Sequence, residues 1–227
     1  MDENNKTYSK DKSIVKKPII RDLWPGLFSI LGCILSITIL SLLIIKATKY
    51  SCMHVISYTI YGASIVLLFL FNALYYFISK KGNEVVTLKK FTHVTGYFYV
   101  IGLFIPYMLC FIEGPWGWTM FGVITLLGIL GIIFSGIWVK WPLALRITYL
   151  SLIIPAITIA FGLIINKFFY KEELKLFILE IAIFLLMILL RYVKKPNIRF
   201  LSYKTISVIF AILLNISNFI ILYESFD

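Results

Sequence analysis

Residues 89–107 read KKFTHVTGYFYVIGLFIPY, and this stretch decides the class of fold. Two lysines open it, and no Asp, Glu, Lys or Arg follows before Glu113, so its apolar part can cross a hydrocarbon core of about 30 Å as a helix. Its polar and small residues recur every three or four positions, at Thr92, Thr95, Tyr99, Gly102 and Pro106. That spacing puts them on one face of a helix. We therefore expect this face to lie against protein and not against lipid.

The composition excludes a water-soluble globule. The chain has 227 residues, of which 60% are hydrophobic and 15% charged, more apolar surface than one domain of this size can hide from water. The net charge of +11 would suggest a nucleic-acid partner in a soluble protein, but here Lys and Arg lie in the breaks between apolar runs. We therefore expect membrane lipids as partners and no nucleic acid, and the oligomeric state stays open.

Seven apolar runs have about the length that a membrane-spanning helix needs. They cover residues 23–45, 55–79, 91–112, 118–139, 141–166, 174–190 and 205–223. The first run is longer than the core of a signal peptide and has no cleavage-like site, so we interpret it as a span that is retained. The sequence thus predicts an all-α polytopic membrane protein, with a basic cytoplasmic tail at 1–22 and one seven-helix domain at 23–227.

The distribution of Lys and Arg predicts the orientation. Sixteen of these residues lie on the side of the amino terminus and five on the other side, while Arg146 lies within a run. Because Lys and Arg are retained on the cytoplasmic side, the amino terminus is predicted to be cytoplasmic and the carboxyl terminus external. Abundant Lys, Asn, Ile, Phe and Tyr are typical of AT-rich bacteria, so we expect a bacterial cell membrane.

Small residues indicate where helices pack closely, because lipid offers no hydrophobic drive for association and backbones must approach each other. Ser29, Gly32 and Ser36 lie on one face of the first predicted helix. The fourth helix carries several glycines that we expect to serve the same purpose: Gly122, Gly128, Gly131 and Gly136.

Three blocks of the sequence carry a family resemblance. Residues 54–64 read HVISYTIYGAS and lead into NALYY at 72–76, residues 92–106 open with TH and end in IGLFIP, and residues 116–122 read WGWTMFG. Together these blocks resemble helices two, three and four of the bacterial hemolysin III family, part of the superfamily that includes the progestin and adipoQ receptors. The resemblance covers about residues 23–223 and implies seven helices with a cytoplasmic amino terminus.

The resemblance also implies a zinc site near the cytoplasmic face. In the family, the ligands are a histidine at the end of helix two and two histidines four residues apart at the start of helix seven. An aspartate of helix three lies beside the metal-bound water. Three histidine ligands leave one position open, where zinc lowers the pKa of its bound water to about 7.

Neutral polar residues stand at or beside those positions in this chain. They are Asn72, Tyr76, Thr92, His93, Tyr203 and Ser207. Tyr76 takes the place of the helix-two histidine, Thr92 that of the aspartate, and the last two residues that of the pair in helix seven. The chain has one other histidine, His54, on the opposite side of the predicted membrane, so no two histidines can share a metal. We therefore expect no metal and no zinc cofactor, but a cluster that joins helices by hydrogen bonds.

Two charged residues within predicted spans, Arg146 and Glu180, leave two interpretations open. A charge at bilayer depth costs at least about 2.5 kcal/mol and often serves function. The first interpretation is therefore a proton or ligand site. The second interpretation is structural: the two residues form an ion pair, Glu180 is protonated, or the Arg146 side chain reaches the membrane interface. A disulfide between Cys52 and Cys110 is also open, because both are predicted near the external face.

The sequence predicts a hemolysin III-like membrane protein that is metal-free and not an enzyme. It contains no complete ligand set, no Ser-His-Asp constellation and no pair of carboxylates for catalysis, so no catalytic residue is assigned. The family name implies a cytolytic or membrane-active role. Two alternatives stay open: a lipid-binding sensor of the receptor type, and a residual lipid amide hydrolase of the zinc type that some superfamily members represent.

Overall fold

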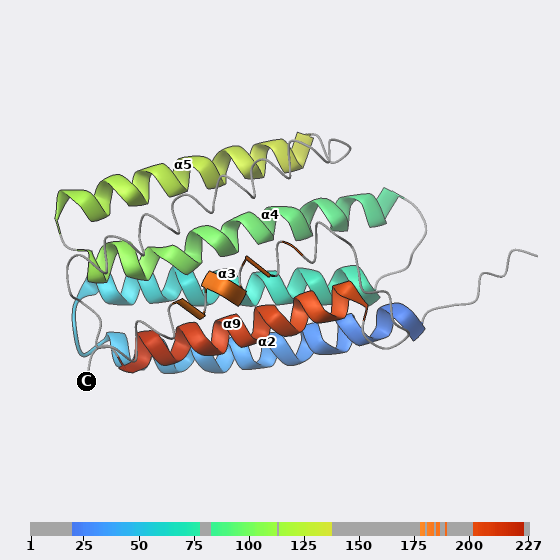
Figure 1. The fold of residues 1–227 in the computed structure, drawn as a ribbon, viewed down its shortest axis with the longest axis horizontal. Coiled ribbons are helices and arrows are strands. Elements are labelled where there is room, and N and C mark those ends of the chain that lie inside the picture. The colour runs from blue at the N-terminus through green and yellow to red at the C-terminus, as the bar shows by residue number, and fades with distance from the viewer. Residues whose placement is uncertain are drawn as a thin grey trace, which may run out of the picture.

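The computed structural model describes residues 20–77, 83–112, 114–137 and 202–224, with short pieces at 178–179, 181–183, 185–186 and 189. In this part of the chain the long elements are helices (Figure 1): α2 (Ile20–Ala47), α3 (Cys52–Phe77), α4 (Asn83–Pro106), α5 (Pro115–Ile137) and α9 (Tyr203–Glu224). Each contains a stretch long and apolar enough to cross a membrane. The all-helical prediction is confirmed here, whereas the predicted span 141–166 and most of 174–190 lie outside the described residues.

All five long helices of the described part begin before their predicted spans. α2 begins within the predicted tail, and α4 begins at Asn83 although the predicted span begins at 91. The prediction stopped at Lys89 and Lys90 because charged side chains mark the edge of the membrane. A helix need not end at that edge, since lysine is a good helix former in water.

Pro106 explains how α4 ends. Proline has no N–H, so it cannot donate to the carbonyl one turn earlier, and the chain continues as a π-helical turn, η1 (Tyr107–Phe111). The N–H of Ile112 then donates to the carbonyl of Tyr107 at 3.0 Å, which is the π-helical spacing. The chain reverses at Gly114, whose φ of 89° suits glycine, and α5 begins with proline at its first position.

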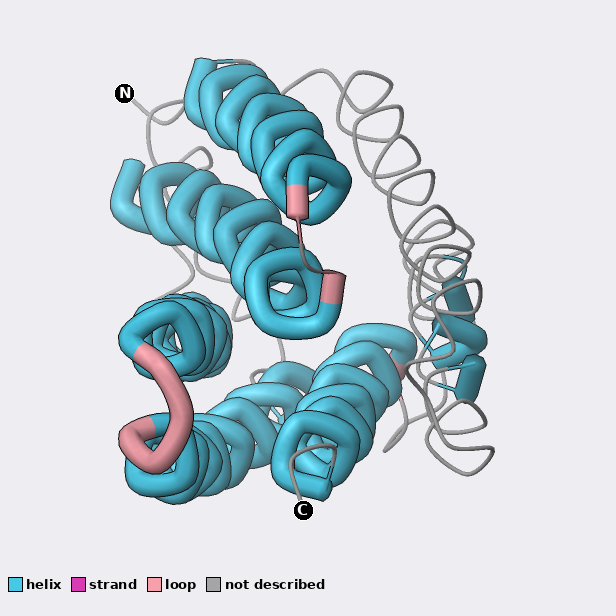
Figure 2. The backbone as a smooth tube through the Cα atoms, turned by 90° about the vertical axis from the view of Figure 1, so that its left-hand side faces the viewer, coloured by secondary structure: helices cyan, strands magenta, loops and turns pink. Residues whose placement is uncertain are grey.

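The helices lie side by side and alternate in direction (Figure 1). We call the Tyr76 end of the bundle the end where α2, α4 and α9 begin and where α3 and α5 finish. The Lys46 end is the opposite one. Viewed from the Lys46 end, α5, α4, α3 and α2 form an arc in which each helix packs on the next, and α9 packs on α2 (Figure 2).

Glycines bring neighbouring helices together, as predicted. Gly32 of α2 lies against the ring of Phe69, Gly102 of α4 against the side chain of Ser64, and Gly131 of α5 against the ring of Tyr97. Gly128 similarly faces Ile101. The prediction is wrong for Gly122, which is exposed with no atom near its missing side chain. It lies two and a half turns from Gly131 and therefore on the opposite face of α5.

The polar face predicted in residues 89–107 is turned inward. Thr95, Tyr99, Gly102 and Pro106 are buried, and Thr92 is half-buried. α4 is the most buried of the spans, because it lies between α3 and α5.

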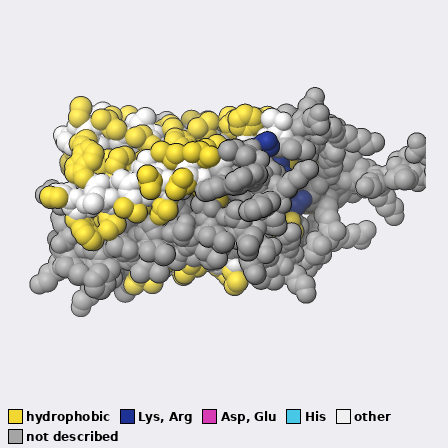
Figure 3. Space-filling model, turned by 90° about the horizontal axis from the view of Figure 1, so that it is seen from above, with side chains coloured by type: hydrophobic (Ala, Val, Ile, Leu, Met, Phe, Trp, Pro, Cys, Tyr) yellow, Lys and Arg dark blue, Asp and Glu magenta, His cyan; other side chains and the backbone are white. Residues whose placement is uncertain are grey.

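Apolar side chains cover the outer surface of α2 and α5, as lipid contact requires. Ile34 and Ile45 of α2 and Leu126 of α5 are about 60% exposed. In Figure 3 the coloured side chains along the bundle are mostly hydrophobic, and Lys or Arg appears toward the Tyr76 end.

We predict that Gly102→Ala destabilises the bundle. A methyl group at Gly102 would lie 2.8 Å from Cβ of the fully buried Ser64, so α3 and α4 must separate. We expect the free energy of unfolding in detergent to fall by about 1–3 kcal/mol. The control is Gly122→Ala, which meets no atom within 4 Å and adds helix propensity. Equal stabilities of the two variants would contradict the packing described here.

Candidate functional site

The six residues of the predicted polar cluster lie in the half of the bundle nearest the Tyr76 end. Asn72 and Tyr76 belong to the last turns of α3, Thr92 and His93 to α4, and Tyr203 and Ser207 to the first turns of α9. Asn72 and Ser207 are buried, and the other four are half-buried. The six residues therefore lie toward the same end of the bundle, and their meeting in one cluster stays a prediction.

Two contacts of the cluster residues are defined at this end. The ammonium of Lys204, at the start of α9, lies 5.9 Å from the centre of the Tyr76 ring and links α9 to α3. The hydroxyl of Thr92 donates to the carbonyl of Leu88 in its own helix, at 3.0 Å. This bond of Thr92 therefore lies within α4. Lys204 is a residue of this end of the bundle that the sequence analysis did not include in the cluster.

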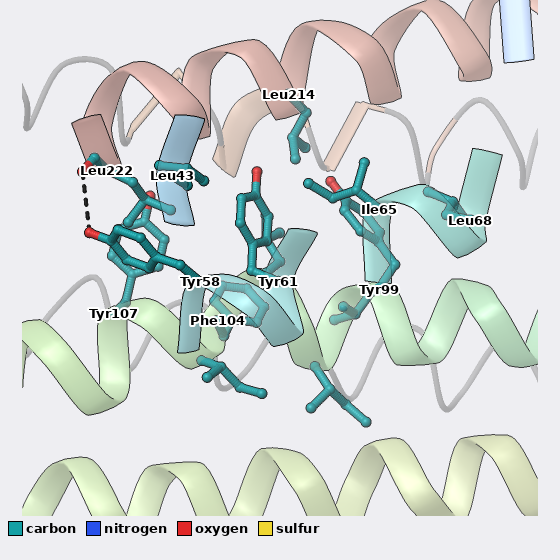
Figure 4. Packing of buried hydrophobic residues seen from close by; sticks show 14 of the residues in the cluster. Leu43, Tyr58, Tyr61, Ile65, Leu68, Tyr99, Phe104, Tyr107, Leu214 and Leu222 are labelled. Carbon is teal, nitrogen blue, oxygen red and sulfur yellow. Dashed lines mark hydrogen bonds between the residues drawn. The ribbon is translucent and has the colours of Figure 1, made fainter. Parts of the chain in front are cut away.

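A second group of polar residues lies deeper in the bundle. Five tyrosines are almost completely buried: Tyr58, Tyr61, Tyr97, Tyr99 and Tyr107. The hydroxyl of Tyr58 donates to the carbonyl of Leu222, at 3.2 Å, and that of Tyr61 donates to Oδ1 of Asn215, at 3.4 Å. Figure 4 shows the rings of Tyr58, Tyr61 and Tyr99 directed from α3 and α4 toward α9. Tyrosines therefore fill much of the space inside the arc.

A signal in α9 could have revealed this second group. Asn215 and Asn218 lie one turn apart in a predicted span, and both are buried. Asparagine in a spanning helix is expected to face protein, because lipid offers it no hydrogen bond. The sequence analysis concentrated on helix ends, where the family places its metal.

The two thiols that could have formed a disulfide are free. Cys52 is exposed at the start of α3, while Sγ of Cys110 lies 3.0 Å from Oγ of Ser57. His54 is in the first turn of α3 and so lies at the Lys46 end, opposite His93 as predicted. Arg146 and Glu180 lie outside the described residues.

The family model described as Haemolysin-III related matches residues 26–224. The chain belongs to this family. It is 39% identical to Hemolysin-3 of Bacillus cereus over 130 residues, which are 56% of each chain. It is 33% identical to the Hemolysin-3 homolog of Bacillus subtilis (strain 168) over 111 residues, 48% of this chain and 52% of that one. The chain spans about half the length of the curated relatives it matches.

Family membership and the apolar helices make this haemolysin III-related protein a multi-pass membrane protein with bacterial relatives. The resemblance seen in residues 54–122 is thus confirmed. The match also includes most of α2 and all of α9, where the sequence analysis found few family residues.

The residues present do not fit the zinc site that the resemblance implies. Zinc in proteins takes Cys, His, Asp and Glu ligands, whereas the six cluster residues offer one imidazole, one amide and four hydroxyl groups. Among the described side chains, no three residues of those ligand types lie close enough to hold a metal ion. What the cluster can do chemically is donate and accept hydrogen bonds between α3, α4 and α9.

Proposed function

We propose that this haemolysin III-related protein is metal-free and non-enzymatic, and that it acts on the lipid bilayer as a membrane-active or cytolytic protein. The observation that carries the proposal is the donor set at the Tyr76 end. By the resemblance, hydroxyl groups of Tyr76, Tyr203 and Ser207 stand where the family has its histidine ligands, and His93 is the one imidazole among the six cluster residues. The hemolysin names of the two relatives support an action on membranes.

A seven-span scaffold with a cytoplasmic amino terminus belongs to the same proposal. α5 finishes and α9 begins at the Tyr76 end (Figure 1). The sequence between them contains two apolar runs, 141–166 and 174–190, each about as long as a span, and two further spans would agree with that arrangement. The excess of Lys and Arg on the side of the amino terminus supports a cytoplasmic Tyr76 end.

The second candidate is a lipid-binding sensor. It is favoured by the polar groups inside the arc, because Tyr61 and Asn215 could exchange their mutual bond for bonds to a lipid headgroup. A residual lipid amide hydrolase has less support, since His93 would have to act with hydroxyl groups in place of a metal-bound water.

We predict that a reporter fused after Asp227 lies outside the cytoplasm, because seven spans put the two termini on opposite sides. An alkaline phosphatase fusion should be active there and a green fluorescent protein fusion should be dark. A matched fusion to the loop between α3 and α4 should give the reverse result. A fluorescent fusion after Asp227 would mean that the protein has one span fewer than proposed, or that its amino terminus is external.

We predict that protein purified without chelator holds far less than one zinc per chain, because its donor set is neutral and nearly free of imidazole. Elemental analysis measures this directly. The matched variant rebuilds the family's ligands with Tyr76→His, Thr92→Asp, Tyr203→His and Ser207→His, and zinc found in this variant alone would support the assigned positions. About one zinc per chain in the unaltered protein would overturn the metal-free proposal.

We predict that the purified protein releases a self-quenched dye from liposomes in a dose-dependent way. A chelator should leave the rate of release unchanged, because no metal takes part. Liposomes carried through reconstitution without protein give the background. If dye release stays at background while a co-purified lipid raises the melting temperature, the sensor replaces the membrane-active role, since a ligand of the folded state stabilises it.

A further inference from the structure

α9 is held in the bundle differently from the other helices. The contacts between α2, α3, α4 and α5 use glycines against side chains, as at Gly32, Gly102 and Gly131. α9 contains no glycine, and five of its ten buried residues are polar: Thr205, Ser207, Asn215, Ser217 and Asn218. One of these five, Asn215, accepts a hydrogen bond from another helix, that of the Tyr61 hydroxyl in α3.

Two further contacts of α9 lie at its last turn. Lys46 of α2 is 92% buried, and its ammonium donates to the carbonyl of Tyr223 and lies 4.1 Å from the centre of the Tyr223 ring. The hydroxyl of Tyr58 in α3 donates to the neighbouring carbonyl, that of Leu222 (Figure 4). Two different helices thus each supply a donor to the same turn.

The last turn of a helix is suited to such donors. The last four carbonyls of a helix have no partner within the helix, and in an apolar environment they must be satisfied from outside. The partial negative charge at this end also attracts a cation such as the Lys46 ammonium. Tyr61 and Asn215 add one bond about two turns earlier.

We propose that Lys46 and Tyr58 form a latch on the end of α9, and that its release lets α9 move away from α2 and α3 while α2 to α5 stay packed. Among the described residues, donors from two other helices meet at the last turn of α9, whereas the glycine contacts extend along the other helices. An opened latch would expose the tyrosine hydroxyls inside the arc. The latch is thus a conformational device, independent of whether the protein perforates a bilayer or binds a lipid.

Hydrogen–deuterium exchange of the full chain in nanodiscs tests this proposal. Lys46→Met keeps the length of the side chain but removes the ammonium, and Tyr58→Phe removes one oxygen. Two interhelical bonds of the usual strength in membranes change an opening equilibrium about tenfold, so the double variant should exchange about tenfold faster in residues 203–224. Exchange in α2 to α5 should stay within about twofold of the unaltered protein.

The controls come from the same region. Lys49→Met and Tyr50→Phe change an exposed lysine and an exposed tyrosine close to the latch, and both should leave exchange in α9 unchanged. Lys46→Arg keeps a cation and should restore slow exchange. If the double variant fails to fold, Tyr58→Phe alone decides, because it deletes a single atom. Unchanged exchange in α9, or an equal acceleration of all helices, would overturn the latch.

Discussion

A hydrocarbon solvent accepts no hydrogen bonds, and the arrangement of this bundle follows from that constraint. Some polar side chains meet it within their own helix. The hydroxyls of Ser29, Ser36 and Thr95 each donate to the carbonyl four residues earlier, so these side chains need no partner from another helix. Tyr58 and Tyr61 meet it by reaching a different helix. The first solution allows close packing through glycine, and the second joins helices across a wider space.

The sequence predicted those parts of the fold that depend on one helix at a time. The burial of Thr95 to Pro106 in α4 agrees with the face that their spacing defines, although the apolar residues between them are buried as well. The buried tyrosines could not be predicted in the same way. Tyrosine is common at the membrane interface, and only the pairing of α3 with α9 shows that Tyr61 meets Asn215.

The sequence predicted the end of the bundle at which the candidate residues lie, and the contacts among them stay a prediction. Helix direction alone brings Asn72, Tyr76 and Ser207 toward the same end, so alternating spans suffice for that part. The contact between Lys204 and Tyr76 depends on the rotation of α9, which periodicity does not give. The family match, over residues 26–224, includes most of α2 and all of α3, α4, α5 and α9.

The π-helical turn has a consequence for comparing sequences. Gly117 of α5 lies directly over the carbonyls of Met108 and Ile112, so any larger residue there would strike the backbone of η1 or of the residue that ends it. A π-helical turn holds one residue more than an α-helical turn. The extra residue lies in the last turn before the chain reverses at Gly114, so it shifts neither the residues of α4 before it nor the start of α5. A relative that lacks one residue between 107 and 111 would still superpose on both sides, and a gap aligned there would mark a change of helix type and not a lost contact.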